Sequence, residues 1–314
     1  MRICERFTVS SAGPSVSICI PTYNYCQYLP DALDSALTQE FTDLEIVVVD
    51  NCSNDGTPEL VESYGRKDSR IVFHRNSRNL GMAANFNRSV ELARGKYVKF
   101  LCADDVLEKD CVRKMVDVLD SQPDVTLVAC RRSVFDKNKR KIRTMGYSNK
   151  PFLRSGQQVT RDCYFKGNLI GEPSAVLFRR ADFVTGFDQE YHQVLDLELW
   201  FRILENGRFV FLAETLCGIR QHESSGTANN LRAGKVAADK VRLFENYAYK
   251  PYLRGSWTER MIWDLRMMYG GYRAAVAGVA AGGLDRATKA LYYPILFGKI
   301  VIPIAVALAA HRSK

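Results

Sequence analysis

Hydrophobic and polar positions alternate in blocks along the first 120 residues, and the blocks predict strands joined by helices. Apolar runs at 16–20, 44–51, 70–76 and 96–103 have the length and composition of buried strands. Between them apolar residues recur at helical spacing, as they do over 29–37. Continuous hydrophobic strands joined by helical crossovers predict a parallel sheet that is covered by helices on both faces.

The pattern becomes mixed after residue 124. Strands are predicted at 125–136, 171–180 and 208–214, with a basic turn or hairpin at 137–146. Apolar residues at helical spacing predict a helix over 196–207. We therefore expect an α/β domain with a central, mostly parallel sheet and a less regular second half.

The net charge of +9 is confined to the end of the chain. Residues 226–314 hold 14 Lys and Arg against 5 Asp and Glu, whereas residues 1–225 hold 30 of each. This difference predicts one domain over 1–225 and a basic helical tail over 226–314. The tail lacks interleaved basic and aromatic positions, so we do not expect it to bind nucleic acid.

An apolar segment at 291–310 contains a single charge, which suits contact with an anionic membrane surface. Pro294 and Pro303 interrupt it, so an interfacial anchor is favoured over a membrane span. Packing of this segment against the domain is the alternative.

The cysteines indicate a reducing compartment. There are nine, an odd number, and no pair has the CxxC spacing of a zinc ribbon. Residues 1–15 contain no apolar run long enough for an export signal. We therefore expect a cytoplasmic protein, peripheral at the inner face of the cell membrane.

Polar clusters follow each of the first four predicted strands. They lie at 21–24, 50–57 and 75–81, and at the adjacent carboxylates Asp104 and Asp105. Ligands bind at the carboxyl ends of parallel strands, so the clusters predict a site. Adjacent carboxylates repel, so a cation or a set of donors should face them, unless they only cap the next helix.

Two common nucleotide-binding motifs do not occur after these strands. Neither G-x-G-x-x-G nor GxxxxGK[ST] follows any of them, which disfavours a dinucleotide redox cofactor and P-loop chemistry.

Five motifs, in this order, resemble the family 2 glycosyltransferases: VSICIPTYN, VVVDNCSNDGT, NLGMAANFN, FLCADD and LDLELWFR. The resemblance covers about residues 15–225 and implies a GT-A fold. It also implies transfer of a sugar from a nucleotide-diphosphate donor to a glycan or lipid-linked acceptor in cell-surface polysaccharide biosynthesis.

By this resemblance several loops contact the donor, and Asp50 accepts hydrogen bonds from the base or ribose. An Asx turn is the alternative role of Asp50, and Asp55, Arg78 and Asn79 have the alternative role of shaping their loops. The implied donor-binding residues are Pro21, Thr22, Tyr23, Asn24, Asp50, Asp55, Arg78, Asn79 and Asp104.

The resemblance also implies a divalent cation, Mg²⁺ or Mn²⁺, at Asp104, Asp105 and His222. A phosphate contact and a structural role are the alternatives for His222. Hard cations prefer oxygen ligands, and the ion would neutralise charge on the leaving nucleotide. Cys102 stands where the family often has the first acid of an Asp-x-Asp motif, which leaves open which carboxylate binds the metal.

Asp196 aligns with the catalytic base of inverting family members, although Leu195 replaces the Glu that usually precedes it. A helix cap is the alternative role of Asp196. Glu198 is the second candidate base. Trp200 could line the acceptor site or pack in the core, and Arg220 is a further candidate contact of the donor.

Two other functions are compatible with the fold. A nucleotidyltransferase would need a Gly-rich and basic phosphate loop after the first strand, and PTYNYCQYLP has neither feature. A nucleotide-sugar-binding module that has lost catalysis would explain Cys102 and Leu195, but not the four acids Asp50, Asp104, Asp105 and Asp196.

Overall fold

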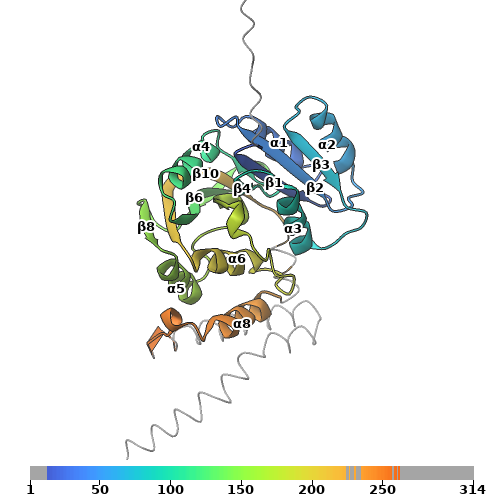
Figure 1. The fold of residues 1–314 in the computed structure, drawn as a ribbon. Coiled ribbons are helices and arrows are strands. Elements are labelled where there is room, and N and C mark those ends of the chain that lie inside the picture. The colour runs from blue at the N-terminus through green and yellow to red at the C-terminus, as the bar shows by residue number, and fades with distance from the viewer. Residues whose placement is uncertain are drawn as a thin grey trace, which may run out of the picture.

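A computed structural model describes residues 13–223, 226, 230, 235–256, 258, 259 and 261 (Figure 1). In this part of the chain one sheet of ten strands has the order β3-β2-β1-β4-β9-β6-β10-β5, with β7 paired to β6 and β8 to β10. The first strands are β1 (Val16–Thr22), β2 (Leu44–Asp50), β3 (Ile71–Arg75) and β4 (Tyr97–Phe100).

The first four strands are parallel, as the sequence predicted. Their side chains alternate between two hydrophobic clusters on opposite faces. One cluster includes residues of α1 (Leu29–Leu37), α2 (Thr57–Gly65) and α4 (Cys111–Ser121), and the other includes residues of α3 (Met82–Leu92). The predicted cover of helices on both faces is therefore confirmed.

The fourth strand is shorter than the predicted 96–103. It ends at Phe100, and the amide of Cys102 donates to Ser174 Oγ at 2.9 Å instead of continuing the ladder. Asp104 and Asp105 consequently lie in a turn between β4 and the short strand β5 (Val106–Leu107).

The second half mixes parallel and antiparallel pairs. Strand β9 (Val176–Arg179) runs antiparallel to both β4 and β6 (Val125–Asp136), and β10 (Arg208–Gln221) runs parallel to β6. The predicted hairpin at 137–146 is confirmed by β7 (Lys141–Met145), which returns antiparallel along β6.

The strand predicted over 171–180 is wrong in its first half. Residues Pro173–Ala175 form the 3-10 turn η1, because Pro173 has no amide to donate and Gly171 adopts a φ of 128°. A second 3-10 turn, η2 (Arg180–Asp182), ends β9. The strand predicted over 208–214 in fact continues to Gln221 as β10.

Strand β8 (Phe152–Ser155) and helix α5 (Gly156–Lys166) were not predicted. Helix α5 begins with a capping box in which the Ser155 side chain accepts from the Gln158 amide and the Gln158 side chain accepts from the Ser155 amide.

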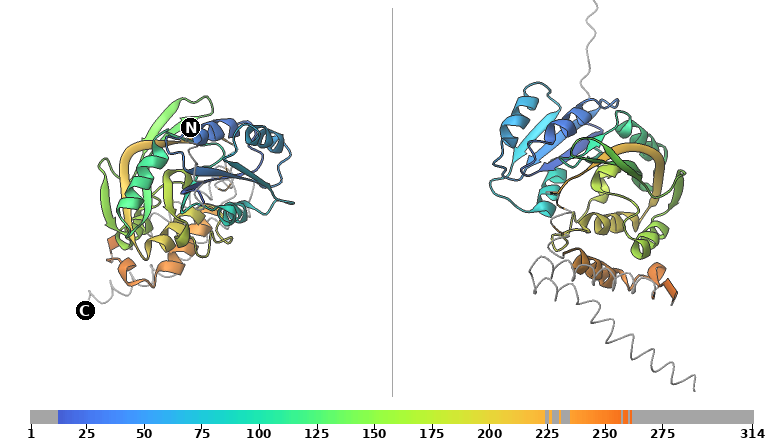
Figure 2. Two further views of the ribbon diagram at one scale, coloured as in Figure 1. Left: turned by 45° about the horizontal axis from the view of Figure 1, so that its top comes forward. Right: turned by 180° about the vertical axis from the view of Figure 1, so that it is seen from behind.

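Helix α8 (Lys235–Tyr247) lies beneath α6 (Leu195–Leu204) in Figures 1 and 2 and is followed by the turn η3 (Pro251–Leu253). Leu243 and Tyr247 are buried, and Tyr247 Oη donates to Glu198 Oε1 at 3.0 Å. The start of the expected tail thus packs against the domain. Within the described residues no helix has the length and apolar character needed to cross a bilayer, and segment 291–310 lies outside them.

A buried lysine ties the parallel half to the mixed half. Lys99 is completely inaccessible to solvent, and its Nζ donates to the carbonyls of Phe100 and Val176 at 3.3 Å and to that of Ser174. Three carbonyl oxygens thus accept the hydrogen bonds of this buried ammonium group, and none of these acceptors is a carboxylate.

Candidate active site

The loops that follow β1 and β2 are joined by hydrogen bonds. The amide of Asn24 donates to Ser53 Oγ at 2.8 Å, and the amide of Asn54 donates to Asn24 Oδ1 at 2.9 Å. Asn24 adopts a left-handed φ of 55°, a conformation that Asn tolerates better than most residues. The sequence prediction that these two polar clusters meet is confirmed.

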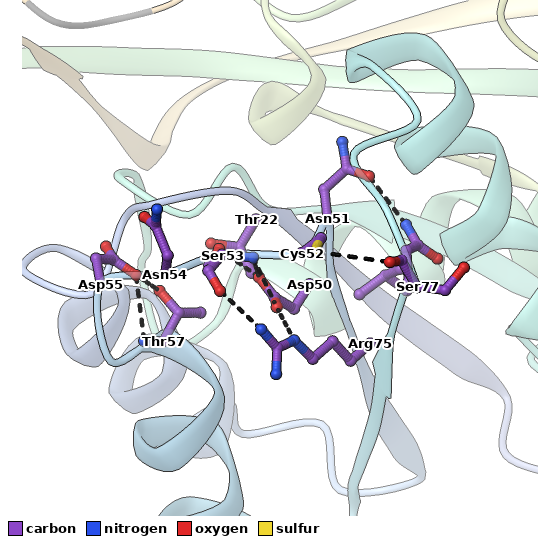
Figure 3. A network of polar contacts seen from close by, with 12 residues as sticks. Thr22, Asp50, Asn51, Cys52, Ser53, Asn54, Asp55, Thr57, Arg75 and Ser77 are labelled. Carbon is purple, nitrogen blue, oxygen red and sulfur yellow. Dashed lines mark hydrogen bonds and ion pairs between the residues drawn. The ribbon is translucent and has the colours of Figure 1, made fainter.

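Asp50 lies at the centre of this network and is fully buried (Figure 3). Its carboxylate accepts from the amide of Ser53 at 3.1 Å and from Ser53 Oγ, and it pairs with Arg75 Nε at 3.3 Å. These are the contacts of the alternative role, in which Asp50 shapes its own loop.

Arg75 is a residue whose part in the site the sequence did not single out. Its guanidinium also donates to the carbonyl of Ser53 at 2.9 Å, and half of its side-chain surface remains exposed. Figure 3 shows it reaching from β3 to the loop after β2. The register pairs Asp50 with Arg75, so the opposite charges of two neighbouring strand ends would have signalled the contact.

Some of the other residues predicted to bind the sugar donor hold the loops in shape, and others are exposed. Asp55 accepts from the Cys26 amide at 2.9 Å and from Thr57 Oγ1 at 2.6 Å, which fixes its loop. Asn79 Oδ1 accepts from Asn51 Nδ2 at 2.8 Å, which joins the third loop to the second.

Pro21 and Thr22 end β1 and are buried, and the buried Thr22 Oγ1 has no hydrogen-bond partner among the described residues. Tyr23, which follows β1, and Arg78, which follows β3, are exposed. These two side chains are therefore accessible to a ligand at this edge of the sheet.

Asp105 is buried and both of its carboxylate oxygens are occupied. Ser174 Oγ donates to Oδ2 at 2.6 Å, and the amide of Arg220 donates to Oδ1 at 3.0 Å. Burial, followed by the negative charge of Asp104, raises the pKa of Asp105 well above its usual value. Donors from η1 and from β10 therefore hold this carboxyl group in place.

Asp104 has a different environment. Its Oδ2 lies 2.9 Å from His222 Nε2, and 14% of its side-chain surface is exposed. The rings of Tyr25 and Tyr28 pack against the imidazole, with centroids 5.8 and 4.8 Å away. The structure thus brings Asp104 and His222 together, although they are 118 residues apart.

The donor set suits a divalent cation that takes two ligands from the protein, an oxygen of Asp104 and a nitrogen of His222. Cys102 is a poor third ligand, because burial and the charges of Asp105 and Asp104 raise the pKa of its thiol well above the usual value. No group of three or more His, Cys, Asp or Glu side chains that could hold a metal ion occurs among the described residues.

Arg220 has a structural role in this arrangement. Its Nε donates to the carbonyl of Asp104 at 2.9 Å and its Nη2 pairs with Asp31 Oδ2 at 2.7 Å. The guanidinium also lies over the rings of Tyr28 and Phe135. Arg220 thereby fixes the turn that carries the two acids.

Asp196 is the second residue of α6 and is partly exposed. The amide of Leu197 donates to its Oδ1 at 2.8 Å, and Asn168 Nδ2 donates to its Oδ2 at 3.1 Å. Burial, reinforced by the negative charge of Glu172, raises the pKa of Asp196 to about 7. Such a carboxylate can accept a proton near neutral pH.

Glu198 and Trp200 face the core. Glu198 accepts from Arg202 Nε at 2.8 Å and from Tyr247 Oη at 3.0 Å, and only 6% of its surface is exposed. Trp200 is completely buried, and its Nε1 donates to the carbonyl of Gly171 at 3.3 Å. Of the two alternatives for Trp200, core packing is the one observed.

The contacts of Ser174 and Asn168 with the acids were not foreseen. Each partner lies far away in sequence, 69 residues for the pair Ser174 and Asp105 and 28 for Asn168 and Asp196. No motif marks either residue, so only the folded chain reveals them.

Comparison with known proteins identifies the family. The model of glycosyl transferase family 2 matches residues 17–187. TuaG of Bacillus subtilis, which carries the name of a teichuronic acid biosynthesis glycosyltransferase, is 28% identical over 231 residues, covering 71% of this chain and 85% of that protein.

Two solved structures share the fold. The crystal structure of S. aureus TarS 1–349 in complex with UDP-GlcNAc has a TM-score of 0.58 at 18% identity and covers 89% of this chain and 91% of its own. The mannosyltransferase PcManGT from Pyrobaculum calidifontis, in complex with GDP-Man and Mn²⁺, has a TM-score of 0.58 at 21% identity and covers 96% of this chain and 81% of its own. The chain therefore belongs to glycosyl transferase family 2 and is a glycosyltransferase with the GT-A fold.

Proposed function

We propose that this enzyme transfers a sugar, with inversion, from a nucleotide-diphosphate donor to a hydroxyl group of a glycan or lipid-linked acceptor in cell-surface polysaccharide biosynthesis. The observation that carries the proposal is Asp196, a partly exposed carboxylate at the start of α6 whose pKa is raised to about 7. The donors bound by TarS and PcManGT and the name of TuaG support the donor class and the pathway.

Asp196 would act as the general base. Inversion requires the acceptor oxygen to attack the sugar from the face opposite the leaving nucleotide. As the new bond forms, the acceptor hydroxyl loses its proton, and Asp196 would accept it. The amide of Leu197 and the side chain of Asn168 hold the carboxylate in place without occupying every lone pair.

The donor would lie along the loops that follow β1, β2 and β3, where Tyr23 and Arg78 are exposed. Asp50 and Asp55 would act mainly by holding these loops in shape, since their oxygens are already hydrogen-bonded. Asn24 and Asn79 join neighbouring loops and would set the spacing of the nucleoside site.

A divalent cation, Mg²⁺ or Mn²⁺, would be held by Asp104 and His222, with Asp105 supporting the turn. When bound, such an ion stabilises negative charge on the leaving diphosphate. The 2.9 Å contact between Asp104 and His222 supports this assignment, as does the Mn²⁺ in the PcManGT complex.

Calorimetric titration of UDP, GDP and dTDP into the full chain, with and without Mn²⁺, tests the donor site. The proposal expects binding that requires the metal and selects one nucleotide. Absence of binding by all three nucleotides to folded protein would contradict it.

We also propose that the protein works at the cytoplasmic face of the membrane, to which the basic tail would attach it. Support comes from the sequence alone, from the charge of +9 in residues 226–314 and the apolar segment 291–310.

A further inference from the structure

Asn168 lies in the loop between α5 and η1, and both the nitrogen and the oxygen of its side-chain amide are hydrogen-bonded. Its Nδ2 donates to Asp196 Oδ2 at 3.1 Å and to the carbonyl of Gly171 at 3.2 Å. Its Oδ1 accepts from the amide of Gly171 at 2.9 Å. The amide plane therefore has a single orientation that points its donor toward Asp196.

Gly171 fixes the shape of this loop. Its φ of 128° is open to glycine, and an added Cβ would lie 3.1 Å from both Ala175 Cβ and Arg132 Nη1. Trp200, in the core, donates to the same glycine carbonyl at 3.3 Å. The position of the Asn168 side chain is thus set by a loop that is packed on the core.

Other charged groups also act on Asp196. Glu172 and Arg132 form an ion pair nearby; the negative charge of Glu172 disfavours an ionised Asp196, and the positive charge of Arg132 favours it. The Leu197 amide at the start of α6 favours the ionised form too. Asn168 adds a side-chain donor that acts directly on Oδ2.

We propose that Asn168 is a positioning residue that orients Asp196 Oδ2 toward the acceptor hydroxyl and stabilises the ionised carboxylate. This inference rests on the proposed function, in which Asp196 is the base. Because Asn168 is exposed, its substitution should leave the fold intact, which makes its effect on Asp196 measurable.

The titration of Asp196 tests the contact without a known acceptor. For the full chain, the free energy of unfolding in urea is measured from pH 5 to 9 for the wild type and for D196N, and the difference gives the titration midpoint of Asp196. The same pair is then measured with Asn168→Ala and with Asn168→Asp. The matched control is Asn206→Ala, at an exposed position in the turn after α6.

Removal of the donor should shift the midpoint upward by about 0.5–1 pH unit in Asn168→Ala, and the added charge should shift it further in Asn168→Asp. Asn206→Ala should leave it unchanged. Equal midpoints in all four backgrounds would overturn the inference, as would a loss of stability in the Asn168 variants without a change in midpoint.

A kinetic measurement separates failure of this inference from failure of the proposed function. The probes are UDP-GlcNAc and GDP-mannose with Mn²⁺, and the readout is release of the nucleotide. Asn168→Ala should lower kcat about tenfold with KM for the donor unchanged. Wild-type rates in D196N would refute Asp196 as the base even if the titration midpoints shift as expected.

Discussion

At the scale of single residues, Asp196 couples its ionisation to the stability of the fold. Its folded-state pKa of about 7 lies above that of the unfolded chain, so ionisation at higher pH destabilises the folded protein. The favourable contribution is complete below about pH 4 and is lost as the pH rises through about 7.

We therefore expect D196N to be more stable than the wild type at pH 8, because it lacks the destabilising charge. The expected gain is only about 1–2 kcal/mol, because partial exposure screens that charge. Near pH 4 the two proteins should unfold at the same urea concentration. D196N should bind the donor nucleotide and fail to transfer the sugar. Equal stability at both pH values would contradict the raised pKa.

Asp104 and His222 are expected to act on the donor through the metal. Asp104→Asn and His222→Ala should each weaken Mn²⁺-dependent nucleotide binding by about tenfold or more, because each removes a ligand. Asp117→Asn is the matched control, since Asp117 lies on the exposed side of α4 with 66% of its side chain accessible. Calorimetry gives the affinities; an unchanged metal dependence in both variants would refute the site.

Among the elements, α8 packs against α6, the helix that carries Asp196. The buried carboxylate of Asp239 accepts from the amides of His192 at 2.7 Å, Gln193 at 2.5 Å and Val194 at 3.4 Å. These amides directly precede α6. The helix that carries Asp196 is therefore held at its start by a residue more than forty positions later in the chain.

Asp239→Asn should lower the free energy of unfolding by about 1–3 kcal/mol, because all three amides donate to Oδ2 and a neutral amide oxygen accepts them more weakly than a charged carboxylate oxygen. Glu245→Gln, at an exposed position on the same helix, should have no effect beyond about 0.5 kcal/mol. Urea denaturation of both variants measures the difference. Equal losses would show that the contact with the loop before α6 does not matter.

The helices and strands also show which parts of the fold sequence patterns can predict. The four parallel strands were predictable because continuous apolar runs are typical of strands whose two faces are both buried, as in a parallel sheet covered by helices. Helix α5 was missed although its capping box is visible in the sequence, and η1 was missed because a two-residue signal, Gly171 and Pro173, competes with an apolar strand pattern. The sequence could also predict which polar residues lie at the carboxyl ends of these strands. It could not predict whether Asp50 faces a ligand or its own loop, because that depends on Arg75, which the pairing of β2 with β3 brings close.

At the scale of the whole molecule, the composition of the basic tail predicts binding to an anionic membrane surface. Removal of residues 284–314 should release the protein from anionic vesicles, since it deletes the apolar segment 291–310. Co-sedimentation with vesicles that contain phosphatidylglycerol measures this. The truncated chain keeps α8 and should retain its unfolding midpoint and nucleotide affinity, whereas unchanged co-sedimentation would refute the anchor.

Ser174 and Lys99 limit how enzymes of this shape can exchange parts. Lys99 binds the carbonyl of Ser174, while the hydroxyl group of Ser174 serves Asp105 and Cys102. A chimera that imports residues 125–221 from a relative with another residue at position 174 would keep three residues that have lost their partner. Crossover points between residues 99 and 174 separate these four positions, so a chimera should inherit them together.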